Sequence, residues 1–157
     1  MTAQVSERLI MGGKEVSMFS NPLGLYLRAS KIRFESPHTA NWRGYVGTWE
    51  IKEHEGVERL YLIKLHAHKT YEEIVDVRDI FPGFDTVFAH WFTGEVRLPQ
   101  GAQLQYKHMG YSSIYEYDFM MQFKHGVLVH KYARHNKLPE EKPVDQSKIP
   151  AFLRRGS

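Results

Sequence analysis

No cysteine occurs among the 157 residues of this sequence. Its absence excludes structural disulfide bonds, thiolate metal sites and a cysteine nucleophile. It also fits a reducing cytosol better than an oxidising extracellular location. The N-terminal stretch, MTAQVSERLIMGG, lacks the basic and apolar segments of a secretory signal peptide. We therefore expect a cytoplasmic protein.

Long apolar runs are missing as well. No stretch approaches the run of about eighteen apolar residues that a membrane-spanning helix requires, so we expect no membrane partner. The charge is also mild, because 21 lysines and arginines against 18 aspartates and glutamates give a net charge of +3. Nucleic-acid-binding proteins usually concentrate a larger positive excess on one face, so this balance is only a weak indication of such a partner.

Two sequence signatures of catalysis are absent. The chain has no glycine-rich phosphate loop with its lysine, and no Gly-x-Ser-x-Gly turn that would expose a nucleophilic serine. No catalytic residue is therefore predicted, and a non-catalytic role is favoured.

Short alternations of apolar and polar residues are frequent in the sequence, and aromatic residues make up 13% of it. Both features are typical of β-strands. Residues 1–13 are expected to be ragged, and strands are predicted at 14–20 and 25–28. Three hairpins are predicted at 47–65, 93–107 and 119–132, with turns at 54–56, 99–101 and 124–126.

One short helix is predicted at 71–80, where apolar residues recur at helical spacing and Pro82-Gly83 ends the element. We therefore expect an all-β, mainly antiparallel fold, either a β-sandwich or a small barrel-like fold, with one short helix. Residues 1–136 form the single β domain of this prediction. Prolines and charged residues over 137–157 predict an extended or partly disordered C-terminal arm.

The spacing of His66, His68 and Glu72 suits a metal site. Residues two apart on a strand point to the same face, so the two imidazoles would lie side by side with a carboxylate nearby. Such ligands bind Zn, Fe, Mn or Ni. The alternative is that both histidines lie at the exposed end of a strand and bind nothing.

The His-x-His-x-x-x-Glu arrangement resembles the first metal motif of the cupins, and the stretch from Gly94 to Gly101 looks like part of their second motif. This resemblance implies a small β-barrel enzyme that holds one divalent transition metal. It implies His66, His68 and Glu72 as metal ligands. His108 would be the fourth ligand. The metal would act as a Lewis acid or bind oxygen.

The most unusual run of the chain extends from Tyr106 to Tyr117. Tyrosine and small hydroxyl residues suit a recognition surface, because they supply contact area and hydrogen bonds at little entropic cost. The residues expected to contact a protein partner or a second copy of the chain are Tyr106, His108, Tyr111, Ser113, Tyr115 and Tyr117. Some of these tyrosines would instead belong to the core if the segment is buried.

A basic patch is predicted near the end of the β domain, and it consists of Lys124, His130, Lys131 and Arg134. Cations interleaved with an aromatic residue such as Tyr132 could stack on and neutralise single-stranded nucleic acid. The same cations would also suit an edge strand, where lysine discourages pairing with other sheets. No nucleic-acid-binding motif accompanies them, so the edge-strand interpretation is favoured.

From these patterns we expect a small non-catalytic binding module of accessory or inhibitor (immunity) type that needs no cofactor. It would recognise a protein, or a second copy of itself, through the tyrosine-rich segment. The cupin-like enzyme is the first alternative, and a nucleic-acid or nucleotide binder is the second.

Overall fold

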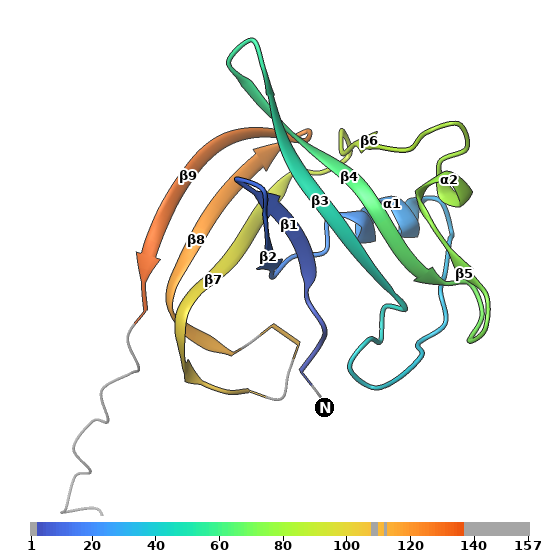
Figure 1. The fold of residues 1–157 in the computed structure, drawn as a ribbon, viewed down its shortest axis with the longest axis horizontal. Coiled ribbons are helices and arrows are strands. Elements are labelled where there is room, and N and C mark those ends of the chain that lie inside the picture. Colours follow the sequence, from blue (N-terminus) through green and yellow to red (C-terminus); the bar gives the residue numbers. More distant parts are fainter. Residues whose placement is uncertain (1–2, 108–109, 112, 137–157) are drawn as a thin grey trace, which may run out of the picture.

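The described part of the chain folds into one curled β-sheet with two short helices (Figure 1). The computed structural model describes residues 3–107, 110–111 and 113–136. Within these ranges the helices are α1 (Leu23–Ala29) and α2 (Val77–Ile80). The strands are β1 (Glu7–Met11), β2 (Lys14–Met18), β3 (Tyr45–His54), β4 (Val57–His68), β5 (Ile74–Val75), β6 (Val87–Phe88), β7 (Gly94–Gln105), β8 (Ile114–Lys124) and β9 (Val127–His135).

The strands pair in the order β2-β1-β3-β4-β9-β8-β7, with β5 and β6 joined to β4. The β1–β3 pair is parallel and the other strand pairs are antiparallel, which confirms the prediction of an all-β, mainly antiparallel fold. The sheet curls without closing, and only Arg59 and Val127 pair β4 with β9. Figure 1 shows β7, β8 and β9 as one wall and β3 and β4 as another, with the β1–β2 hairpin between them.

Three hairpins turn through two residues whose backbone is left-handed. These residues are Gly12 and Gly13 between β1 and β2, Glu55 and Gly56 between β3 and β4, and His125 and Gly126 between β8 and β9. Two-residue turns of this kind match the twist of the strands that they join. The hairpins predicted at 47–65 and 119–132 are confirmed, and their turns lie inside the predicted turn ranges.

The strand predicted at 25–28 is wrong, because these residues belong to α1. Leu23 and Leu27 are both buried and lie one helical turn apart, so they form the apolar face of a short helix. Leu25 lies between them and is 53% exposed. Residues 1–13 also differ from the expectation of a ragged segment, since β1 pairs with both β2 and β3.

The helix predicted at 71–80 forms only over its last four residues, as α2. A capping box explains where it begins. The Asp76 carboxylate accepts a hydrogen bond from the Arg78 amide at 3.0 Å, and the Asp79 carboxylate accepts one from the Asp76 amide at 2.8 Å. The carboxylates of Asp76 and Asp79 therefore cap the N-terminus of α2. With α1, the described chain has two helices rather than one.

The hairpin predicted at 93–107 is also wrong, because β7 runs from Gly94 to Gln105 as one strand. Pro99 pairs with Asp118 of β8, and the register shifts between Gln100 and Gln103. Such a shift marks a β-bulge, in which extra residues are accommodated without reversing the chain. The glycine and proline of the predicted turn therefore belong to this bulged strand.

The core lies inside the curl of the sheet and forms one cluster of buried side chains. Trp49, Leu60, Leu62 and Leu98 are fully buried in it. Burial of large apolar side chains such as these is the main stabilising contribution to a fold of this size. Within the described ranges, neither helix has the length and apolar character needed to cross a membrane.

Candidate functional site

A carboxylate is buried at the start of β1. Glu7 is 0% exposed, and its Oε2 atom lies 2.8 Å from Nη2 of Arg43. Oε2 also accepts a hydrogen bond from the Gly47 amide at 2.7 Å, and Oε1 accepts one from the Trp49 indole at 3.3 Å. Both oxygens are therefore bonded to nitrogen donors, which is the arrangement that an ionised carboxylate requires.

The electrostatics around Glu7 extend to a neighbouring tyrosine. Burial raises the pKa of Glu7, against the opposing effects of Arg43, the Gly47 amide and the Trp49 indole. Burial, together with the Glu7 charge, also raises the pKa of Tyr45 far above its ordinary value. The Tyr45 hydroxyl therefore stays neutral and can donate a hydrogen bond at any physiological pH.

A glycine at the start of β3 allows a second segment to approach Tyr45. A Cβ atom on Gly44 would lie 2.5 Å from the Glu35 carbonyl oxygen and 2.8 Å from Cβ of Phe34, and Gly44 has a φ of 76°. Only glycine tolerates both this backbone conformation and this contact. The Phe34 ring consequently packs edge-on against the Tyr45 ring, with 5.8 Å between centroids.

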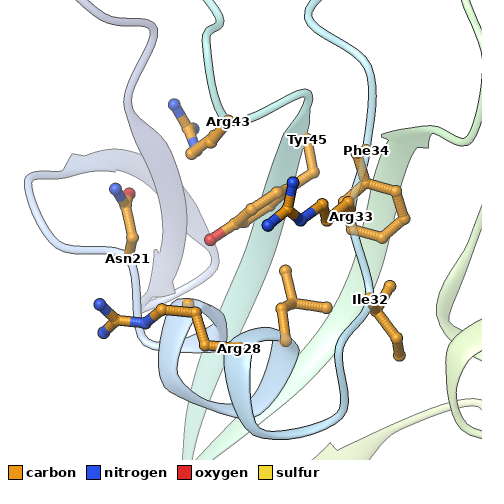
Figure 2. A pocket seen from close by; sticks show the side chains of 9 residues that line it. Asn21, Arg28, Ile32, Arg33, Phe34, Arg43 and Tyr45 are labelled. Carbon is orange, nitrogen blue, oxygen red and sulfur yellow. The ribbon is translucent and has the colours of Figure 1, made fainter.

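These segments line an open pocket of about 450 Å³ (Figure 2). Its lining consists of Asn21, Gly24, Leu27, Arg28, Ile32, Arg33, Phe34, Arg43 and Tyr45. Figure 2 shows the three arginine side chains around Tyr45, each contributed by a different segment of the chain. The described lining contains no acidic residue, so its charge is positive.

The three arginines differ in their partners. Arg43 is bound from behind, because it donates hydrogen bonds to Glu7 and to the Val5 carbonyl oxygen. Arg28 and Arg33 are exposed, and their side chains make no ion pair or hydrogen bond with another described residue. The Tyr45 hydroxyl likewise has no hydrogen-bond partner among the described residues. Two cations and one hydroxyl thus remain available to a ligand.

Tyr111 supports the rim of this pocket. Its hydroxyl donates a hydrogen bond to the side-chain oxygen of Asn21 at 2.6 Å, and its ring stacks on Phe19 with 5.0 Å between centroids. Burial raises the pKa of Tyr111 to about 12. Among the residues predicted to bind a partner, Tyr111 is therefore connected to the pocket through Asn21.

A second buried carboxylate, Asp118 of β8, holds the segment that contains Tyr111. Asp118 is 1% exposed and bonds to Arg97 and Arg134, each at 2.7 Å. Arg97 in turn donates to the carbonyl oxygens of Tyr111 at 2.7 Å and Ser113 at 2.8 Å. This network fixes the backbone before β8 and, through it, the Tyr111 ring.

Asp118→Asn is expected to lower the free energy of unfolding by about 2 kcal/mol, because Arg97 loses its charged partner in a mostly buried position. Burial opposes ionisation of Asp118, but hydrogen bonds from Arg134, Arg97 and Asn136 hold its pKa below the ordinary value of 3.8. The stabilisation by Asp118 is therefore present above pH 3.8 and is lost as the pH falls below it. Urea denaturation at pH 7 and pH 3 measures both effects.

The control for that experiment is Glu95→Gln, which changes an exposed carboxylate on the same sheet. It should change stability by less than about 1 kcal/mol. A loss at Asp118→Asn no larger than at Glu95→Gln would contradict the role given to Asp118.

The predicted metal ligands are not assembled in the described part of the chain. His66 and His68 do lie close together on β4, with 5.3 Å between ring centroids. Glu72 is exposed in the turn that follows β4, and no group of three His, Asp or Glu residues in the described ranges could hold a metal ion. His108 lies outside the described residues. Glu72 lies inside a turn that is closed by hydrogen bonds from the amides of residues 69 and 70 to the Glu73 carbonyl oxygen.

The tyrosine-rich segment does not form one exposed face. Tyr106 and Tyr117 are exposed, whereas Ser113 is buried. Tyr115 is half-buried and packs edge-on against Phe19, as Tyr111 does face-on. The Ser113 hydroxyl also exchanges hydrogen bonds with the backbone of Lys107, so it links the two ends of this part of the segment. The alternative was that some of these tyrosines belong to the core; Tyr111 and Tyr115 are half-buried against Phe19, and neither is among the buried core residues of the described chain.

The predicted basic patch is divided between the two faces of β9. Lys131 pairs with the buried Met121 and faces the inside of the curl, whereas Arg134 pairs with Asp118 on the other face. Beyond Val127, β9 pairs only with β8 among the described strands, so it is an edge strand over most of its length. This position agrees with the edge-strand interpretation of its cations.

Comparisons of this chain with models of protein families, with curated proteins and with solved structures found no match. The pocket must therefore be interpreted from its own chemistry. Sequence patterns did not single out Arg28, Arg33, Arg43 and Tyr45, which line this pocket. One available signal was the Trp-Arg-Gly-Tyr run at 42–45, in which a cation and two aromatic residues surround a glycine.

Proposed function

We propose that this protein is a non-catalytic binding module whose ligand is a small organic anion held in the arginine pocket, defined as the cavity around Arg28, Arg33, Arg43 and Tyr45. The observation that carries the proposal is the pairing pattern of its cations. Arg28 and Arg33 line one pocket without a counter-ion in the described chain, and the Tyr45 hydroxyl, which stays neutral, belongs to the same lining as Arg43. Unpaired cations around a concave, partly apolar site favour an anionic ligand.

The chemistry of the lining supports binding more than catalysis. The described lining offers arginines, an asparagine amide, a tyrosine hydroxyl that stays neutral, and apolar side chains. None of these groups is a good proton acceptor near neutral pH. The proposal therefore keeps the expected class of protein, a small binding module in the cytoplasm, and replaces the tyrosine-rich segment with the arginine pocket as its binding site.

The double variant Arg28→Gln/Arg33→Gln is expected to bind small organic anions at least about tenfold more weakly than the wild type, because each lost cation removes a charge-assisted hydrogen bond. Ligand-observed NMR with a panel of small carboxylates, sulfonates and phosphates measures this. The charge-matched control is Lys14→Gln/Lys124→Gln, which removes two exposed cations that lie outside the pocket. Equal weakening in both double variants would show that only net charge matters and would refute the proposal.

A further inference from the structure

The charges around the arginine pocket indicate which ligand charge it would favour. Arg43 is neutralised by the buried carboxylate of Glu7 at 2.8 Å. Arg28 and Arg33 have no such partner in the described chain, so the pocket presents two uncompensated positive charges. A ligand with two negative charges would leave this site neutral, whereas a carboxylate or sulfonate would leave one cation unpaired.

The donor groups also favour a tetrahedral anion. Guanidinium groups bind phosphate oxygens through paired N–H donors, and arginine is the usual residue where such recognition is needed. Figure 2 shows Arg28 and Arg33 on different sides of Tyr45, one on α1 and one on the segment that follows α1. Donors from several directions suit the several oxygens of a phosphate better than the two oxygens of a planar carboxylate.

The volume and the apolar wall indicate that the anion carries an organic group. A cavity of about 450 Å³ lies within the range of pockets that hold small organic ligands, and it is far larger than an inorganic ion requires. Leu27, Ile32 and Phe34 supply an apolar wall next to the arginines. Gly24 adds space, since a Cβ atom there would lie 3.8 Å from the Tyr45 hydroxyl.

We infer that the ligand of the arginine pocket is a phosphate monoester of a small organic molecule. This inference rests on the proposed function and narrows it to one chemical class. The phosphate group would lie between Arg28, Arg33 and the Tyr45 hydroxyl, and the organic group would contact Leu27, Ile32 and Phe34. A phosphate monoester carries a charge close to −2 at neutral pH, which matches the two unpaired cations.

Isothermal titration calorimetry at pH 7.5 in phosphate-free buffer tests this inference with four probes: phenyl phosphate, benzenesulfonate, benzoate and inorganic phosphate. Phenyl phosphate should bind at least about tenfold more tightly than benzenesulfonate, which has the same ring and a tetrahedral group but one charge fewer. It should also bind at least about tenfold more tightly than inorganic phosphate, because the ring buries apolar surface.

Two variants locate the binding. Arg28→Gln/Arg33→Gln should abolish the preference for phenyl phosphate over benzenesulfonate. Gly24→Leu keeps every charge but places a side chain in the cavity, and it should weaken phenyl phosphate binding by at least about tenfold. Leucine is a better helix former than glycine, so α1 should remain folded, and thermal unfolding checks this.

The outcomes separate the two proposals. Benzenesulfonate or benzoate could bind as tightly as phenyl phosphate while still requiring Arg28 and Arg33. This result would overturn the phosphate inference and leave the organic-anion proposal standing. If inorganic phosphate bound as tightly as phenyl phosphate, the inference that the ligand carries an organic group would be overturned. Full binding in Gly24→Leu would place the ligand outside the cavity and overturn the inference. Failure of every probe to bind, or binding that ignores both arginines, would overturn both proposals.

Discussion

Glu7→Ala should lower the free energy of unfolding by about 4 kcal/mol, one of the two largest effects expected in this chain. The substitution leaves the Arg43 guanidinium, the Gly47 amide and the Trp49 indole without their acceptor in a buried position. Each unsatisfied buried donor costs free energy, and the unpaired charge of Arg43 costs most. The space vacated by the side chain adds to the loss.

Urea denaturation at pH 7 measures this change, and Glu15→Ala is its control. Glu15 also pairs with an arginine, since it lies 3.5 Å from Arg8, but its side chain is 57% exposed. An exposed pair of this kind contributes less than about 1 kcal/mol, so the control should unfold nearly as the wild type does. A Glu7→Ala loss as small as that of Glu15→Ala would mean that the buried carboxylate does not support the fold.

The sequence predicted the hairpins best where turn chemistry and alternation agree. At 47–65, apolar residues alternate on both strands, and Glu55-Gly56 supplies the left-handed turn. At 93–107 the same local signals were misleading, because a glycine and a proline that suggest a turn also suit a bulge. Only the pairing of β7 with β8 along its whole length decides between the two, and that pairing is not encoded in the local sequence.

The arginine pocket was missed because its residues are separated in the sequence and meet only through tertiary contacts. Arg28 belongs to a segment predicted as a strand, and Glu7 belongs to a segment expected to be ragged. A signal for Glu7 did exist: it is two residues before Leu9, so in a strand both share one face. Both are fully buried. A carboxylate on an apolar strand face indicates a paired, buried acid, and Arg43 is its partner.

The pocket combines a fixed inner part with free groups at its opening. Behind it, Glu7 fixes Arg43, and Arg97 with Asp118 fixes the Tyr111 segment that bonds to Asn21. In front, Arg28 and Arg33 have no described partner. Fixed inner groups favour binding because they are already positioned, whereas free arginines must lose conformational entropy on binding. Because Arg28 and Arg33 carry the unpaired charge of the pocket, its selectivity should depend on the charge of the ligand.

Gly47→Ala should destabilise the protein by about 3 kcal/mol for a steric reason, which is the other large effect expected here. A Cβ atom on Gly47 would lie 2.7 Å from Oε1 of Glu7 and 2.9 Å from the Trp49 indole nitrogen. Both atoms are held in place by the buried hydrogen bonds, so neither can move away without losing a partner. Gly24→Ala is the control, because its Cβ meets nothing closer than 3.8 Å and alanine favours a helix.

A double-mutant cycle in urea separates a collision with Glu7 from a general intolerance of side chains at position 47. In the Glu7→Ala background the carboxylate is gone, so Gly47→Ala should cost about 1 to 2 kcal/mol less than it does in the wild type. An equal cost in both backgrounds would show that Gly47 is not required by the carboxylate. A reduced cost would instead show that the buried acid, which also bonds to Arg43, is the reason why position 47 requires glycine.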